Sequence, residues 1–224
     1  MTFKFRWEWL PQLVRGLGLS LEVTAICVLI GIALGLLLAF GRLYGRRWIS
    51  WPCRLYIEFF RATPLLVQLL MVYYGFPSWG ISLSPFVSGI LAFGLNTAAY
   101  QAEYFRGAIQ AVRPGQTLAA RSLGMTLPQT VRYVILPQAV RLVIPPWSNE
   151  LILMLKYSSI LYMVTLPDIM GEAKKLAAKH FNSFDVYLVV ALFYLALVLV
   201  VTLGLRAVEK RLHIPGLGAP GEHR

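Results

Sequence analysis

Long apolar stretches alternate with short basic segments along most of this 224-residue chain. As a helix, residues 17–40 would be about 36 Å long, which is enough to cross a hydrocarbon core of roughly 30 Å. Gly31 and Gly35 in this stretch form a GxxxG spacing, which favours close approach of a neighbouring helix. Five such stretches predict an all-α membrane protein with five transmembrane helices, because helices satisfy their own backbone groups in lipid. The predicted spans are residues 17–40, 56–76, 83–102, 142–166 and 186–205.

The remaining segments flank a predicted transmembrane domain at residues 17–207. Residues 1–16 mix aromatic side chains, among them Trp9, with charges, which is typical of a segment at the level of the lipid headgroups. Residues 167–184 carry apolar side chains at helical spacing and predict an amphipathic linker helix. Residues 208–224, which are rich in Gly and Pro, predict a tail without regular structure.

The loop at residues 103–137 breaks the apolar pattern with a compact polar segment. Pro114-Gly115 is a turn dipeptide, so we expect the helix of the third span to stop there. Residues 116–123 predict a short helix, and Gly124 lies where a helix ends through a left-handed residue.

A second short helix is expected directly after this turn. Thr126–Gln129 has the sequence of a capping box with a proline in the first turn, and Pro137 marks the expected end of the helix. The loop therefore predicts a helix-turn-helix that stands outside the bilayer.

Composition supports the membrane class, and the distribution of charge predicts an orientation. The chain is 58% hydrophobic and 14% charged, whereas soluble domains carry about 25% charged residues. With the N-terminus outside, the cytoplasmic segments hold thirteen Lys and Arg and the outer segments hold six. Because cytoplasmic loops are enriched in cations, we expect an outside N-terminus, a cytoplasmic C-terminus and a cytoplasmic loop at 103–137. The net charge of +11 then follows from topology, and no nucleic acid is expected as a partner.

Polar residues inside the second predicted span are candidates for a solute path, since charges in hydrocarbon need partners or water. Arg54, Glu58, Arg61 and Gln68 share one face if this span is a single helix. We assign Arg61 and Gln68 to the path. An internal Glu58–Arg61 ion pair near the cytoplasmic end explains the same pattern equally well.

In the third predicted span, Asn96, Tyr100 and Glu103 share a face and are also candidates for the path. Glu103 lies close to the cytoplasmic end of the span. A simple ion pair with Arg106, or contact with water, is the alternative for this carboxylate.

The fourth apolar stretch gives the strongest indication of a path, because polar residues interrupt it. Asn149 and Glu150 precede the interruption, which consists of Lys156, Tyr157, Ser158 and Ser159. Broken helices in transporters present backbone groups and helix ends to a polar solute near the middle of the membrane. The pattern predicts that Asn149, Glu150, Lys156, Ser158 and Ser159 line the substrate path.

Several separated motifs stand out in the loop and beside it. In the loop they are Ala119-Ala120, Gly124 and Val134-x-Leu136-Pro137. The flanking motifs are Arg61-Ala-Thr-Pro-Leu-Leu-Val-Gln68, Ala99-Tyr-Gln-Ala-Glu-Tyr-Phe-Arg-Gly107 and Asn149-Glu150 with Lys156. Over roughly residues 16–209 the chain resembles ABC-importer permeases for polar amino acids, and its loop residues resemble the EAA loop of this family. The glutamate that heads the loop motif in the family is Leu118 here.

This resemblance implies a type I ABC importer permease in a bacterial-type inner membrane, with a loop that couples it to an ATPase. The implied partners are an ABC ATPase dimer, a second permease subunit (identical or homologous) and an extracytoplasmic amino-acid-binding protein. ATP would be bound by the ATPase, so no cofactor is expected in this chain. The implied coupling residues are Gln116, Leu118, Ala119, Ala120, Arg121, Gly124, Met125, Leu136 and Pro137.

Other classes stay open at this stage, and missing motifs narrow them. The chain contains no P-loop sequence, no nucleophile–His–acid set and no metal-ligand spacing, so an enzyme is not expected. An ATP-independent channel or secondary carrier would also need polar residues in its spans, although no doubled set of helices is visible. A membrane scaffold would explain the docking loop but leaves the interrupted fourth span unexplained.

Overall fold

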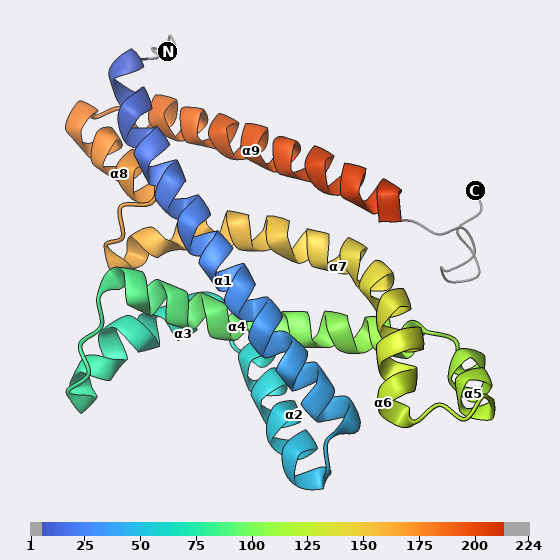
Figure 1. Cartoon of the computed structure of the whole chain (residues 1–224). Coiled ribbons are helices and arrows are strands. Elements are labelled where there is room, and N and C mark those ends of the chain that lie inside the picture. Colours follow the sequence, from blue (N-terminus) through green and yellow to red (C-terminus); the bar gives the residue numbers. More distant parts are fainter. Residues whose placement is uncertain (1–5, 213–224) are drawn as a thin grey trace.

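The computed structural model describes residues 6–212, all of which lie in helices or in the turns between them (Figure 1). In Figure 1, α1 runs diagonally across α7 and α4, and α5 stands out from the other helices. In chain order the elements are η1 Trp7–Trp9, α1 Leu10–Tyr44, α2 Arg47–Ala62, α3 Leu65–Leu70, η2 Met71–Gly75, η3 Phe76–Trp79, α4 Pro85–Ala111, α5 Pro114–Ser122, α6 Leu127–Thr130, η4 Val131–Ile135, α7 Leu136–Tyr157, η5 Ser158–Val164, α8 Ile169–His180 and α9 Ser183–Leu212.

Close packing of α1 on α4 confirms the expectation from the GxxxG spacing. A Cβ atom at Gly31 would lie 2.2 Å from Nε2 of Gln101, and one at Gly35 would lie 3.1 Å from backbone atoms of Ala98 and Ala102. Only glycine allows the two backbones to approach this closely.

The second predicted span, residues 56–76, is wrong as a single helix. The helix α2 ends at Ala62, and the segment that starts at Leu65 turns away from it by 101°. Thr63 has extended backbone angles (φ −106°, ψ 140°), because the ring of Pro64 disfavours helical backbone in the residue before it. Gln68 therefore does not share a helical face with Arg61.

The start of the cytoplasmic loop agrees with the sequence pattern. α4 continues beyond the predicted span and ends at Ala111, just before Pro114. Gly124 has a φ of 81° and ends α5. The N–H groups of Gly124 and Met125 donate to the carbonyls of Arg121 and Ala120 at 3.0 and 3.1 Å, which is the bonding of a Schellman motif.

The second helix of the loop also begins as expected but does not end as expected. Thr126 and Gln129 form the capping box, with the Thr126 N–H donating to Gln129 Oε1 at 2.8 Å. The helix continues past Pro137 through α7, so the predicted end at Pro137 is wrong. Pro137 lies in the first turn of α7, directly after the wider π-helical turn η4, where the missing N–H is tolerated.

The predicted interruption of the fourth span is a change of helix type and not a gap. α7 ends at Tyr157 and continues directly as the 3₁₀-helix η5, so the two parts are not separate pieces. The chain turns only afterwards, at Thr165, which has a left-handed φ of 63°. The bend into α8 is 52°.

The linker helix is confirmed as the amphipathic α8, whose apolar face packs on the start of α1 and on α9. Asp168 caps this helix by accepting from the N–H groups of Gly171 and Met170 at 2.9 and 3.2 Å. Trp9 is fully buried against α8 and α9. α9 continues to Leu212 through the start of the predicted tail, and the rest of that tail lies outside the described residues.

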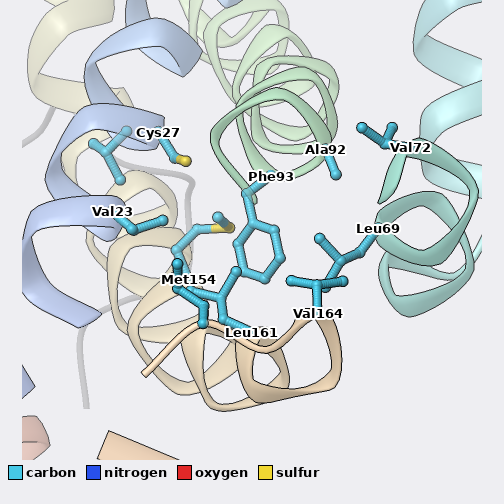
Figure 2. Packing of buried hydrophobic residues seen from close by; sticks show 11 residues of the cluster. Val23, Cys27, Leu69, Val72, Ala92, Phe93, Met154, Leu161 and Val164 are labelled. Atoms are coloured by element: carbon cyan, nitrogen blue, oxygen red, sulfur yellow. The ribbon is translucent and has the colours of Figure 1, made fainter. Parts of the chain in front are cut away.

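Buried side chains from α1, α3, α4, α7 and η5 meet in one apolar cluster, which joins the two halves of the chain (Figure 2). Phe93 of α4 lies near its centre, next to Met154 of α7 and Leu161 of η5. Val23 and Cys27 of α1 approach from one side, and Leu69, Val72 and Val164 from the other.

Among residues 6–212, two helices are long and apolar enough to cross a membrane by themselves, namely η1–α1 together and α9. The count rises to four if each of two bent helix pairs forms one span. The third predicted span, which lies in α4, is not in this set. Its length is sufficient, but polar residues such as Asn96, Thr97 and Gln101 lower its hydropathy.

Candidate functional site

The predicted path residues fall into three separate polar clusters. The first lies at the break between α2 and α3 and contains Gln68 and Asn96, both buried. Gln68 Nε2 donates to the carbonyls of Phe60 and Thr63 at 2.9 and 3.0 Å and to the Thr63 hydroxyl at 2.7 Å. Asn96 Nδ2 donates to the Phe60 carbonyl and to Gln68 Oε1, both at 3.1 Å. These side chains satisfy the carbonyls that the end of α2 leaves without helical partners.

The second cluster surrounds Glu150, whose residue exposure is 4%. Thr97 and Tyr104, both on α4, donate to its two carboxylate oxygens at 3.1 and 3.3 Å. Gln101 Nε2 donates to the Thr97 hydroxyl at 3.2 Å, and Trp147 Nε1 donates to Gln101 Oε1 at 3.1 Å. Two hydroxyls thus hold a carboxylate that makes no ion pair within residues 6–212.

The third cluster is charged and lies around Glu103, towards the predicted cytoplasmic end of α4. Arg42 of α1 pairs with Glu103, Arg61 of α2 lies 3.8 Å from it, and Arg106 donates to it at 2.7 Å. Arg61 also stacks over the ring of Tyr100, at 5.4 Å from its centroid. The Glu103–Arg106 ion pair, the alternative to a path role for Glu103, forms. Glu58 lies 3.9 Å from Arg42, and the contacts of the described residues include no Glu58–Arg61 pair.

Lys156 and Ser159 lie apart from all three clusters. They line a pocket of about 440 Å³ that η5 forms with α8 and α9. Ser158 is buried and donates to the Leu155 carbonyl at 2.8 Å, while Asn149 is exposed. Glu150 and Lys156 therefore do not share one site within this chain.

The sequence analysis missed several residues that complete these clusters: Arg42, Thr97, Gln101, Tyr104 and Trp147. A signal for two of them was present, because Thr97 and Gln101 are four residues apart and share a helical face. Their partners come from other helices, so the spacing alone could not identify Glu150 as the group that they contact.

The predicted coupling residues lie mainly on α5 and its exit turn. Leu118 and Leu123 are 69% and 84% exposed, Gln116, Ala119 and Arg121 are exposed, and Ala120 faces inwards. Met125 is half-buried at the turn. Leu136 and Pro137 lie away from α5 at the start of α7, where Leu136 lines an apolar pocket with residues of α1 and α4.

The described residues contain no group of three His, Cys, Asp or Glu side chains that could hold a metal ion. Both cysteines are free, with Cys27 buried and Cys53 half-buried.

Residues 6–212 combine long apolar helices, polar clusters between them and an exposed basic loop, an arrangement typical of the membrane-embedded subunit of a transporter. The family described as "Binding-protein-dependent transport system inner membrane component" matches residues 31–214, and the chain belongs to this family. It is a permease subunit of an ABC importer and not itself an enzyme, since a partner ATPase hydrolyses the ATP. Membership also implies an inner-membrane location and a binding-protein partner.

Relatives and solved structures agree with this assignment over nearly the whole chain. A probable amino-acid ABC transporter permease of Bacillus subtilis, YckA, is 36% identical over 91% of this chain and 90% of its own length. The arginine transport permease ArtQ of Bacillus subtilis is 34% identical (91% and 93%), and the glutamine permease GlnP of Escherichia coli is 30% identical (93% and 96%).

Two solved structures have the same fold. A crystal structure of an amino acid ABC transporter with histidines is 38% identical, covers 94% of this chain and 100% of that chain, and has a TM-score of 0.90. An inward-facing MetNI methionine ABC transporter, 20% identical with a TM-score of 0.78 over the same shares, supports the fold alone.

Proposed function

We propose that this permease imports a polar amino acid and that α5 transmits the movement of the ATPase to the membrane helices. Relatives described as arginine and glutamine permeases support the substrate class. So does the 38% identical structure of an amino acid transporter. The particular amino acid is left open, because relatives for differently charged amino acids have comparable identity.

The observation that carries the coupling role is the exposure of α5. Leu118 on this short helix and Leu123 directly after it are mostly exposed, although a leucine gains free energy by burial. α5 stands apart from the long helices in Figure 1 and offers an apolar and cationic surface. Such a surface suits a helix-in-groove contact with the ATPase.

The position of α5 between α4 and α7 explains how a movement of the ATPase would be transmitted to the polar clusters. α5 follows α4 after only Val112 and Arg113, and it leads into a helical segment that runs from Leu127 to Val164. α4 carries Thr97, and α7 carries Glu150, which Thr97 contacts. Closure of the ATPase pair on ATP binding would move both helices and open the path outwards, and hydrolysis would reverse the movement.

Variants of the two exposed leucines test this role. Leu118→Ser with Leu123→Ser should insert normally, since neither side chain is buried, but should co-purify less ATPase and lower uptake at least severalfold. Leu212→Ser, at the far end of α9, removes an exposed leucine outside α5 and serves as the control. Normal ATPase binding and uptake by the double variant would contradict the coupling role.

We further propose that the path includes Glu150 and Lys156 and that the other predicted path residues line or support it. The support for Glu150 is that two hydroxyls hold its buried carboxylate and that it has no ion pair within residues 6–212. Glu150→Gln and Lys156→Met should leave the complex assembled and impair uptake. If both variants were instead lost from the membrane, Glu150 and Lys156 would have structural roles.

The finer topology is also part of the proposal: five spans, an outside N-terminus and a second permease subunit, identical or homologous. The basic α4–α7 loop supports a cytoplasmic position. Leu118 in place of the family's glutamate is compatible with a division of work between two different subunits. A cysteine at exposed Gln116 should react with an impermeant thiol reagent only in inside-out vesicles. Labelling in intact cells would contradict this orientation.

A further inference from the structure

A groove of about 550 Å³ lies between the N-terminal part of α1 and α8, which are neighbours at one end of the molecule (Figure 1). Three cations line it: Arg15 from α1, and Lys175 and Lys179 from α8. Glu172 is the one carboxylate among the lining residues, and it already pairs with Lys175 at 2.7 Å. Within residues 6–212, Arg15 and Lys179 have no ion pair, so the groove holds two uncompensated positive charges.

The position of Arg15 along α1 places this groove at the edge of a membrane. Between Arg15 and Arg42 the helix carries a single charge, Glu22, and its most apolar window has a mean hydropathy of 2.8. Arg15 therefore lies where the helix leaves the hydrocarbon, at the depth of lipid phosphates. Phe181 and Phe184, after α8, are largely exposed, and exposed phenylalanine rings favour insertion at the boundary between headgroups and acyl chains.

We propose that this groove binds the phosphate group of an anionic phospholipid such as phosphatidylglycerol. Arg15 and Lys179 would contact the phosphate from two helices, while Leu19 and Pro167 form an apolar part of the wall for the glycerol and upper acyl chain. The volume fits a lipid headgroup. A wall that combines cations with a leucine on the membrane-crossing helix favours a lipid over an acidic protein surface. The site goes beyond the transport role and does not depend on which solute is carried.

Lipid binding to the purified full chain tests the proposal. Each cation near an anionic lipid surface contributes about fivefold in affinity, so loss of two predicts about 25-fold weaker binding. Arg15→Gln with Lys179→Gln should lose phosphatidylglycerol by that factor in native mass spectrometry or in titrations with lipid nanodiscs. Phosphatidylcholine should bind weakly to the parent protein and to this double variant alike.

A matched control keeps the result specific to the groove. Lys174→Gln with Lys210→Gln removes the same charge from α8 and α9 without touching the groove, and should bind phosphatidylglycerol like the parent protein. Equal losses in the two double variants would overturn the proposal, because the effect would then be one of net charge.

Three other outcomes would also overturn it. Equal binding of phosphatidylcholine and phosphatidylglycerol by the parent protein would show a zwitterionic lipid site. Displacement of the lipid by inorganic phosphate at low millimolar concentration would show a site for a free anion. Unchanged lipid binding with weakened capture of an extracytoplasmic binding protein would show a protein-docking surface.

Discussion

Two sharp turns in this permease, one after α2 and one after α5, are held in different ways. At the first, Gln68 and Asn96 donate to the last carbonyls of α2, and Asn96 belongs to a helix that is distant in the sequence. At the second, the bonds run between backbone groups a few residues apart, and Gly124 supplies the left-handed conformation. Side-chain amides, one of them from a distant helix, fix one angle, and local backbone geometry fixes the other.

This difference explains why one turn could be predicted and the other could not. Gly124 and the capping box are local signals, and both appear in the structure as expected. Pro64 is also a local signal, but Pro52 and Pro145 lie inside helices without ending them. What distinguishes Pro64 is the group of amides that satisfies the broken end of α2, and those amides come together only after folding.

The largest expected effect concerns Gln68, because it makes the most hydrogen bonds at the first turn. Gln68→Leu would leave the carbonyls of Phe60 and Thr63 with fewer donors, and Asn96 with one acceptor less, in a buried place. Each unsatisfied buried group costs about 1–3 kcal/mol, so the free energy of unfolding should fall by about 2–5 kcal/mol. Titration of the purified protein in detergent with a denaturant measures this change in the free energy of unfolding.

Gln138→Leu is the control for this substitution. Gln138 is also partly buried, but it donates only to the carbonyl of Val134 in its own helical segment, at 2.8 Å. Its loss should lower stability by less than about 1.5 kcal/mol. If both variants were equally stable, the first turn would not depend on its side-chain amides.

The same contrast between long-range and local constraint can be measured at two glycines of α1, with a smaller effect. A Cβ at Gly31 would meet Gln101 and Thr97 of α4, whereas one at Gly18 would meet nothing within 4 Å. Gly31→Ala should destabilise the protein by about 1–3 kcal/mol, the usual cost of overpacking. Gly18→Ala should stabilise it by about 0.5–1 kcal/mol, because alanine is the better helix former. Destabilisation by both would show that helix packing does not explain the difference.

The candidate site was predictable to a similarly limited degree. Polarity within apolar stretches identified Glu150, Asn96 and Glu103, because a charge or amide in such a place needs partners. The partners themselves were mostly missed, since Tyr104 and Arg42 reach these groups from other helices or from beyond the predicted spans. Lys156 and Glu150 are six residues apart on one helical segment, and only the structure shows that they face different neighbours.

The smallest effect on stability, with a large effect on function, is expected at Gly124. A Cβ atom there would meet no atom within 4 Å, so the main obstacle to the substitution is the backbone angle. A residue with a Cβ is disfavoured by roughly 1–2 kcal/mol at this φ, most strongly if β-branched. That strain lies in an exposed turn and cannot unfold the packed helices, but it can change the angle at which α5 meets the ATPase.

Gly124→Val should therefore reach the membrane in near-normal amounts while ATPase co-purification and uptake fall, and Gly124→Asn should be milder because asparagine tolerates a left-handed backbone. Gly115→Val is the matched control, since that glycine lies on the same short helix, has equally open space and does not have a positive φ. It should leave coupling intact. Full uptake by Gly124→Val, or an equal loss in Gly115→Val, would mean that the left-handed turn does not orient the coupling helix. The two turns would then differ in structure, but this difference would not affect transport.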